Sequence, residues 1–392
     1  MLKGKAIKRL RISMGTLLFL ALMVAVFLKL SPDNKLFMYK RYSSPKYNLY
    51  AKYSQIFLGQ PMPASYISKK NLDDKLAHPA AWIPIQINND FSNYHDVSKQ
   101  NVIATYNDLP AGDWVILFQI EKGQLTVTQK KDTVLNGSAT QGLKMYSNIF
   151  RYIAKQGYVN DLSFLLRLSD FMHNASERQV AMSAPILTTA KDLSKTKEKK
   201  FILIPDYMSL EDITKIADRV LFANTVFPWQ SKEDKVLWRG GYADVSGFRA
   251  KVVAFGEKHP EFVDAKFVVE QKDFLSPEMQ VRAKCLLSID GHTAAWTRPI
   301  WQLFSNSVML KQDSPMTQWY YAALQPGVDY IPVSNDVNQL EASVKAYTDT
   351  QLEAIAIHGS DFAKNNLTFD DMMAYIVQVL QTYERLQANQ GG

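Results

Sequence analysis

The sequence contains a single cysteine, Cys285, which excludes an intramolecular disulfide. This cysteine stands in an apolar run, so we interpret it as a buried structural thiol rather than a reactive one. Asp-x-Asp motifs, zinc-type histidine pairs, G-x-S-x-G motifs and P-loops are all absent. These absences argue against a metal–diphosphate clamp, a zinc site, a serine hydrolase and a nucleoside triphosphatase. We therefore predict neither a metal nor a cofactor.

What is present is a long, apolar and basic chain. Its 392 residues are 47% hydrophobic and 12% aromatic, which is enough for a packed protein of two domains. The net charge of +7 favours an anionic partner, such as a nucleotide sugar, a phosphorylated glycolipid or a membrane surface. No recognition helix, zinc-finger spacing or RNA-binding strand motif is found, so we predict no nucleic-acid partner.

The N-terminus has the pattern of a membrane anchor. Residues 1–13 carry five basic side chains, and residues 14–28 are apolar and uncharged. This stretch is slightly shorter than the roughly 20 residues of a spanning helix, but Lys29 can extend toward the headgroups. A cleaved signal peptide is the alternative, although the lack of an A-x-A site favours an uncleaved single-pass anchor. Positive charges flank the span on both sides, so they do not determine its orientation.

Strands alternate with helices along most of the chain, which favours an α/β fold with parallel sheets. The first two predicted strands are joined as a hairpin around Lys122-Gly123. Beyond residue 338 the pattern is helical. The apolar runs that predict strands in the first half of the chain are residues 114–120, 125–127, 164–168 and 201–204.

The densest apolar segment of the chain has the pattern of one βαβ unit. Residues 285–289 lack a helical period and predict a buried strand, which ends at the turn Asp290-Gly291. Residues 293–304 predict a helix, although Pro299 requires a kink or a late start. Residues 307–310 predict a second buried strand.

The start of this predicted helix is a candidate anion site. Its main-chain N–H groups and the helix dipole favour a phosphate, and Arg298 lies about one turn into the helix, within reach of the same anion. The alternative is a helix N-terminus that only packs on a sheet. The candidate residues are Thr293, Ala294, Ala295, Trp296, Thr297 and Arg298, with His292 as a possible site-lining neighbour.

Two segments that combine glycine with arginine form a second candidate. Arg239-Gly240-Gly241 is followed, after a short turn, by Gly247-Phe248-Arg249. Glycines let a backbone approach a ligand closely, and two guanidinium groups can grip one phosphate. The alternative is a glycine turn with two surface arginines. We select Arg239, Gly240 and Arg249 as candidate phosphate-binding residues.

A third candidate is Asp170, which directly follows the predicted strand at residues 164–168. A carboxylate in this position stands at the C-terminal edge of a sheet, where the sites of α/β proteins form. The alternative is a helix N-cap or a solvated loop acid.

The βαβ segment resembles glycosyltransferase family 90, which includes Rumi-type protein O-glucosyltransferases, capsule xylosyltransferases and lipopolysaccharide-modifying enzymes. The shared pattern is K-Y-L-L-x-x-D-G-x-x-A-x-x-x-R, and it matches Lys284 to Arg298 with Cys285 in place of Tyr. A later segment that ends in Tyr330-Ile331-Pro332-Val333 is similar as well, with Asp329 where the family usually has His. The resemblance covers residues 160–385 and is poor over the first 150.

The resemblance implies roles for the candidate residues. Asp170 is similar to the family's general base, which deprotonates the acceptor hydroxyl. Asp206 matches a Pro-Asp element of the family, and we interpret it as structural or site-lining. The residues that the resemblance assigns to the nucleotide diphosphate of the donor are Arg239, Gly240, Arg249 and the run from Thr293 to Arg298. Arg298 would offset the charge that develops on the leaving phosphate.

The fold implied by the resemblance is a GT-B-like α/β architecture, in which two Rossmann-like domains face a cleft and an N-terminal helix anchors the chain. The predicted parts are a basic N-terminus with an anchor at 1–30, a stem at 31–66, an acceptor-side domain at 67–200, a nucleotide-sugar-binding domain at 201–340, and helices packing across both at 341–392.

The implied activity is metal-independent, inverting transfer of a hexose or pentose from a UDP-sugar to a hydroxyl of a glycan or glycolipid. The anchor favours an acceptor of lipopolysaccharide-core or capsule type at a membrane. The lack of disulfides favours the cytoplasmic face of a bacterial inner membrane. Departures from the family pattern at Arg167, Met172, Gly241 and Asp329 leave an alternative, a catalytically inactive member that binds glycans or nucleotide sugars. A membrane-tethered hydrolase is disfavoured because no nucleophile is recognisable.

Overall fold

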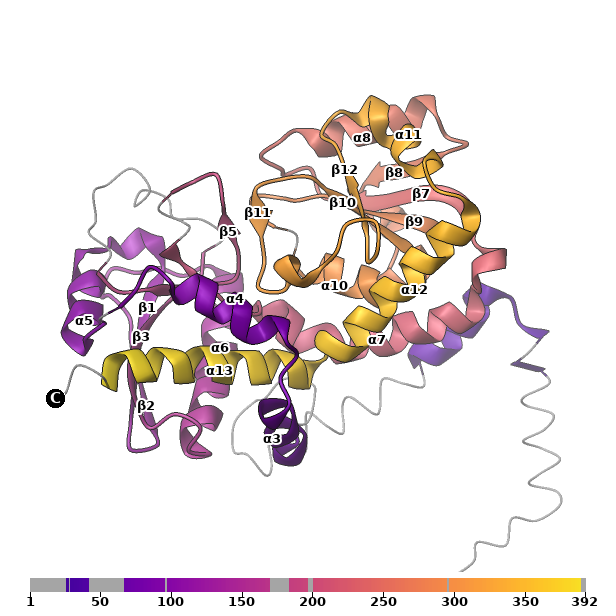
Figure 1. Ribbon diagram of the computed structural model, residues 1–392. Helices are drawn as coiled ribbons and strands as arrows, with labels where there is room; N and C mark the ends of the chain where they lie inside the picture. The colour runs from indigo at the N-terminus through magenta and orange to yellow at the C-terminus, as the bar shows by residue number, and fades with distance from the viewer. Residues whose placement is uncertain are drawn as a thin grey trace, which may run out of the picture.

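The computed structural model describes residues 26–27, 29–41, 67–95, 97–169, 183–196, 200–294 and 296–388. The chain forms a mixed α/β structure around two five-stranded sheets, which lie side by side in Figure 1. The predicted α/β class with parallel, Rossmann-like sheets is confirmed.

The first sheet has the strand order β2-β1-β3-β4-β6. Its first three strands pair antiparallel, whereas β3, β4 and β6 run parallel. The hairpin between β1 and β2 is confirmed, and its turn residues Lys122 and Gly123 have φ angles of 49° and 78°, in the left-handed region that tight hairpins use. The strands are β1 (Val115–Glu121), β2 (Gln124–Thr128), β3 (Asp161–Arg167), β4 (Ile186–Thr188) and β6 (Ile202–Leu203).

The second sheet has the order β12-β10-β9-β7-β8 and is parallel throughout. Its central strands are buried over nearly their whole length, as expected of a parallel sheet covered on both faces. Their C-terminal ends meet at one edge of the sheet. The strands are β7 (Glu233–Gly240), β8 (Val263–Phe267), β9 (Ala283–Ser288), β10 (Val308–Gln312) and β12 (Ile331–Val333).

Helices surround both sheets, and α7 packs against α10 between them. The predicted βαβ unit is present, with a late helix start: α10 begins at Thr297, so Pro299 lies in the first turn, where its missing N–H breaks no helical bond. The helices are α3 (Lys69–Ala77), α4 (Trp82–Phe91), α5 (Lys99–Asp108), α6 (Gly137–Lys155), α7 (Tyr207–Val226), α8 (Phe248–Lys258), α9 (Pro277–Gln280), α10 (Thr297–Phe304), α11 (Leu340–Lys345), α12 (Asp349–Asn366) and α13 (Phe369–Ala388).

One hydrophobic core continues from the first sheet to the inner face of the second. On that face Leu237, Leu286 and Met309 join the core of the first sheet, whereas their strand neighbours point into a second core. The second core contains Cys285, whose burial raises the pKa of its thiol to about 12, in agreement with a structural thiol.

The junction between the two sheets differs in detail from the predicted boundary at residue 200. The strand β6 follows that boundary but belongs to the first sheet. A small third sheet then joins the two parts, because β5 (Lys191–Asp192) pairs antiparallel with β11 (Met316–Thr317) from the loop after β10. Backbone hydrogen bonds therefore cross the junction directly.

The last two helices pack against different sheets. The helix α12 packs on β10 and α10, whereas α13 packs along β3 of the first sheet, where the Tyr383 hydroxyl donates a 2.9 Å hydrogen bond to the Pro185 carbonyl. In Figure 1, α13 crosses the first sheet, and α12 rises from the end of α13 toward the second sheet.

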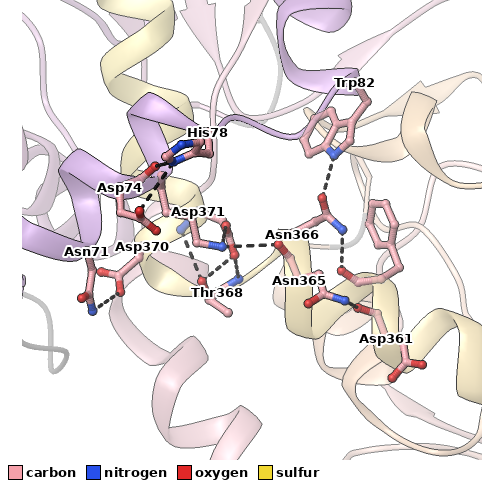
Figure 2. A network of polar contacts seen from close by, with 12 residues as sticks. Asn71, Asp74, His78, Trp82, Asp361, Asn365, Asn366, Thr368, Asp370 and Asp371 are labelled. Atoms are coloured by element: carbon pink, nitrogen blue, oxygen red, sulfur yellow. Dashed lines mark hydrogen bonds and ion pairs between the residues drawn. The ribbon is translucent and has the colours of Figure 1, made fainter.

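Polar contacts fix the turn between these helices (Figure 2). The Thr368 hydroxyl accepts a 3.3 Å hydrogen bond from the Asp371 amide, and the Asp371 carboxylate accepts one of 3.0 Å from the Thr368 amide. The Trp82 indole donates a 2.9 Å hydrogen bond to Asn366, and Asn71 donates one of 3.2 Å to Asp370. The helices α3 and α4 therefore hold the turn between α12 and α13 in place.

The N-terminal segment is partly docked. Residues 32–41 form a helix whose Leu36 is buried and whose Tyr39 ring stacks on Phe222 of α7 at 4.1 Å. The predicted stem at residues 31–66 is therefore not a free tether in this part, because aromatic packing holds it against α7. The predicted anchor at residues 14–28 lies outside the described residues except for 26 and 27. Within the described part of the chain, no helix is sufficiently long and apolar to span a bilayer.

Candidate active site

A cavity of about 280 Å³ opens at the C-terminal end of β3, between the two sheets. Aromatic rings from both sides line it: Trp114 and Tyr146 from the first sheet's side, Tyr207 from α7, and Trp296 from the loop before α10. We call it the aromatic cavity. Its size and its combination of rings with a few polar groups are typical of a site for a small polar ligand.

A buried cation forms part of this wall. The guanidinium of Arg167 donates hydrogen bonds of 2.8 Å to the Thr188 hydroxyl and 3.1 Å to the Ala190 carbonyl, and it lies 4.7 Å above the Phe201 ring. Ser169, two residues further on, also lines the cavity. The predicted base, Asp170, lies outside the described residues, so its role stays a prediction.

Asp206 lines the same cavity and caps the helix α7. Its carboxylate accepts hydrogen bonds of 2.9 Å from the Ser209 amide and 2.5 Å from the Ser209 hydroxyl. Burial raises the pKa of Asp206, and the hydrogen bonds from Ser209 oppose this rise. Because its oxygens already serve the helix N-terminus, Asp206 is structural as well as site-lining.

A second cavity, of about 220 Å³, lies at the C-terminal edge of the second sheet. The loop after β9 supplies Gly291, His292, Thr293 and Ala294, and Arg249 supplies a positive charge. We call it the cationic cavity. Trp296 lines both cavities, so they adjoin at this residue.

Arg249 is fixed by main-chain carbonyls rather than by a carboxylate. Its guanidinium donates hydrogen bonds of 3.0 Å to Asp290, 3.0 Å to Gly241 and 3.3 Å to Ile289. Gly291 permits this approach, because a Cβ atom there would lie 3.1 Å from a guanidinium nitrogen. Burial lowers the pKa of Arg249, and the nearby Asp244 and Asp290 partly offset that effect.

Arg298 lies close to Arg249. Its Nη2 donates a 2.6 Å hydrogen bond to the main-chain oxygen of Arg239, and its Nη1 has no hydrogen-bond partner among the described residues. Burial, and then the charge of Arg249, lower the pKa of Arg298 to about 10. Two neighbouring cations in a shielded place are costly unless an anion joins them, so the arrangement fits an anionic ligand.

Arg239 does not bring its guanidinium to this cavity. Its Nη2 lies 2.8 Å from both carboxylate oxygens of Asp264, and its Nη1 donates to the carbonyls of Trp238 and Asp264. The side chain therefore braces β7 against β8. Gly240 also serves the fold, because a Cβ atom there would lie 2.5 Å from the Trp238 ring.

The remaining candidates cluster around α10. Thr293 and Ala294 are buried beside the cationic cavity, His292 is exposed at it, and Thr297 begins the helix. Ala295 lies outside the described residues. Among the described residues, no group of three or more His, Cys, Asp or Glu is placed to hold a metal ion.

Comparison with known sequences shows the family of this chain. The sequence model of "Glycosyl transferase family 90" matches residues 111–391, more than half of the chain. The chain belongs to glycosyl transferase family 90. The match begins well before the segment in which the sequence motifs are dense, and it includes β1, where the sequence resemblance is weak.

Several curated proteins are similar to this family 90 chain. Protein O-glucosyltransferase 3 of Mus musculus is 26% identical over 267 residues, which cover 63% of this chain and 52% of the relative. Protein O-glucosyltransferase 2 of Danio rerio is 24% identical over 268 residues, which cover 63% and 52%. Protein O-glucosyltransferase 1 of Homo sapiens is 29% identical over 175 residues, which cover 41% and 44%. The chain spans about half the length of the first of these relatives.

Of the four aromatic residues of the aromatic cavity, sequence reasoning selected Trp296 and missed Trp114, Tyr146 and Tyr207. Trp114 has φ 51° and ψ 39°, a left-handed conformation that is strained for a bulky residue. It follows a short 3₁₀ turn, and its carbonyl accepts a 3.1 Å hydrogen bond from the Leu168 amide, so β3 helps to hold the strain. No sequence signal marks such a backbone, because glycine or asparagine is the usual residue there.

Proposed function

We propose that this family 90 chain transfers a sugar from a UDP-sugar to a hydroxyl of a glycan acceptor. The observation that carries the proposal is the pair of adjoining cavities with Trp296 as their common wall. One cavity is cationic and suits a diphosphate, whereas the other is aromatic and suits a sugar acceptor. A transferase needs these two sites next to each other, so that donor and acceptor react without diffusing apart.

On the donor side, Arg249 and Arg298 hold the diphosphate together with the loop at residues 291–294. When the bond between the anomeric carbon and the UDP oxygen breaks, the electron pair leaves with UDP and adds negative charge. Fixed guanidinium groups stabilise this charge in the transition state. The same positive charges make a metal ion unnecessary, so the proposed transfer is metal-independent.

On the acceptor side, Asp170 takes the proton of the attacking hydroxyl as its oxygen bonds to the anomeric carbon. One displacement of this kind inverts the anomeric configuration. Asp206 is a poorer choice for the base, because both of its oxygens accept hydrogen bonds from Ser209.

We further propose that the two sheets act as GT-B-like halves and that residues 14–28 anchor the chain in a membrane. The basic residues before this stretch and the docked helix at residues 32–41 support a fixed position at a bilayer surface. The acceptor class that fits this location is a lipopolysaccharide core or capsule glycan at the cytoplasmic face of a bacterial inner membrane.

The test is UDP release by the purified full chain with a panel of UDP-sugars and extracted glycan acceptors, with product masses measured by mass spectrometry. We expect release with at least one donor, also in the presence of a metal chelator. The Asp170→Asn variant should lose transfer and keep UDP binding. If the chain bound UDP but released no UDP from any combination of donor and acceptor, the proposal would be contradicted. That result would support an inactive member of the family that only binds its ligand.

A further inference from the structure

An exposed tyrosine stands on a column of aromatic rings at the edge of the second sheet. Tyr242 follows the end of β7, and 61% of its surface is exposed. Its ring stacks on Phe267, the last residue of β8, with a centroid distance of 4.2 Å and an interplanar angle of 26°. Phe267 in turn meets the buried Trp238 edge to face at 5.8 Å. The column holds the Tyr242 ring in one orientation while it remains open to solvent.

The column stands at the rim of the cationic cavity. Ala243, the next residue after Tyr242, lines that cavity. Arg249, which supplies the cavity's charge, lies 5.7 Å from the Trp238 ring and donates to the carbonyl of Gly241. The same short segment therefore carries the aromatic platform and contacts the cation.

The spacing between platform and cavity is that of a nucleotide. The loop at residues 291–294 follows β9, whereas Phe267 ends β8, and β7 separates these strands. Parallel neighbours lie about 5 Å apart, so the strand end at Phe267, on which the Tyr242 ring stacks, is about 10 Å from the strand end that leads into the loop. A ligand that joins a diphosphate to an aromatic base through one ribose spans such a distance along the edge of the sheet.

Other apolar side chains at this rim are exposed too. Val245, whose amide donates a 3.2 Å hydrogen bond to the Gly291 carbonyl, is 71% exposed, and Val269 just beyond β8 is 64% exposed. Apolar groups gathered beside a charged cavity mark a binding surface for a ligand that is part anion and part ring. Inorganic phosphate or pyrophosphate would leave all of them in water.

We propose that Tyr242 is the platform on which the base of the donor nucleotide stacks. This inference rests on the proposed function for the identity of the ligand as a nucleoside diphosphate. The ring offers its face to the base, and the diphosphate reaches Arg249 and the loop at residues 291–294. Because every base has a π face, stacking supplies affinity for the nucleoside part and little choice between bases.

The test compares Tyr242→Ala with Tyr242→Phe in the full chain, and the affinities for UDP and for inorganic pyrophosphate are measured by calorimetry. The Ala variant should bind UDP about 5- to 100-fold more weakly, the range expected for loss of one stacked base. Its affinity for pyrophosphate should not change, since pyrophosphate has no base. The Phe variant keeps the ring and should bind UDP as the unmodified chain does. Ile357→Ala, an exposed apolar truncation on α12, is the matched control and should change neither affinity.

Two results would contradict the proposal that Tyr242 stacks on the base. UDP affinity in Tyr242→Ala equal to that of the unmodified chain would exclude stacking. If Tyr242→Ala lowered the affinities for UDP and for pyrophosphate by the same factor, Tyr242 would only support the shape of the cavity. Failure of the proposed function has a separate signature: the unmodified chain would bind UDP, with the loss in Tyr242→Ala, yet release no UDP from any sugar donor.

Discussion

The Nη2 of Arg298 donates a 2.6 Å hydrogen bond to the main-chain oxygen of Arg239. The sequence assigned both arginines to one diphosphate, but the structure gives them different tasks. The side chain of Arg239 holds two strands together through Asp264, and its carbonyl accepts the hydrogen bond that orients Arg298. Arg298 stays a proposed ligand of the diphosphate, whereas Arg239 supports it through the main chain.

Arg298→Ala should reduce the release of UDP from a sugar donor by at least about 100-fold, because a fixed positive charge near the leaving phosphate is lost. Folding should be kept, since the substitution gives up one side-chain hydrogen bond, from Nη2 to the Arg239 carbonyl, and also removes a buried positive charge. Initial rates and thermal unfolding of the same preparation provide the measurement. Turnover near that of the unmodified chain would exclude Arg298 from the site.

Arg239→Ala should act mainly on stability. It removes the bidentate contact to Asp264 and leaves this partly buried carboxylate with the weaker ion pair to Arg282 at 3.6 Å, which costs about 1–3 kcal/mol of unfolding free energy. Asp264→Ala should have a similar effect, and the double variant should lose clearly less than the sum of the two. Urea unfolding of the four proteins measures this coupling. Unchanged stability with a raised KM for the UDP-sugar would instead assign Arg239 to the ligand.

Gly240→Ala and Gly241→Ala form a matched pair. A Cβ atom at Gly240 would lie 2.5 Å from the Trp238 ring, so the indole or the strand must shift, at about 1–3 kcal/mol. At Gly241 nothing lies within 4 Å of the added atom, so this variant should keep the stability of the unmodified chain. Thermal unfolding of both variants is the measurement, and equal melting temperatures would contradict the contact.

Lys232 should make stability depend on pH. Its ammonium donates hydrogen bonds to the Val281 carbonyl at 2.6 Å and the Ser307 hydroxyl at 2.9 Å, and burial lowers its pKa from the ordinary 10.5 to about 7. Between these two pH values the unfolded chain binds a proton that the folded chain has released. The free energy of unfolding should therefore rise as the pH increases from about 7 to 10.5, by at most about 1.4 kcal/mol per pH unit. Below pH 7 the lysine should make no contribution that changes with pH.

Lys232→Met should remove this dependence. The difference between the unfolding free energies of the two proteins, measured in urea from pH 6 to pH 10, isolates the contribution of the lysine from those of other groups. If the unfolding free energies of the two proteins changed with pH in the same way, Lys232 would stay charged in the folded chain.

The sequence predicted those parts of the fold that depend on local pattern. The βαβ unit followed from an uninterrupted apolar run and a turn at Asp290-Gly291, and the β1–β2 hairpin followed from its turn residues. The sequence also brought together most of the cationic cavity, because Gly291 to Arg298 are close in the chain.

Contacts that depend on strand order were not predictable in this way. Asp264 becomes the partner of Arg239 only because β8 lies beside β7, and no spacing along the chain reveals that pairing. Trp114 shapes the aromatic cavity through a strained backbone that its residue type disfavours. The docked helix at residues 32–41 depends on the stacking of Tyr39 on a helix almost two hundred residues away.

The small sheet formed by β5 and β11 limits the motion of the two large sheets relative to each other. Together with the turn between α12 and α13, it fastens the two large sheets to each other at two separate points. Because the hydrophobic core also continues from one sheet to the other, the two sheets are joined along their contact as well as at these points. Separation of the sheets would expose this core, so ligand entry and release should proceed by movement of the loops that line the cavities.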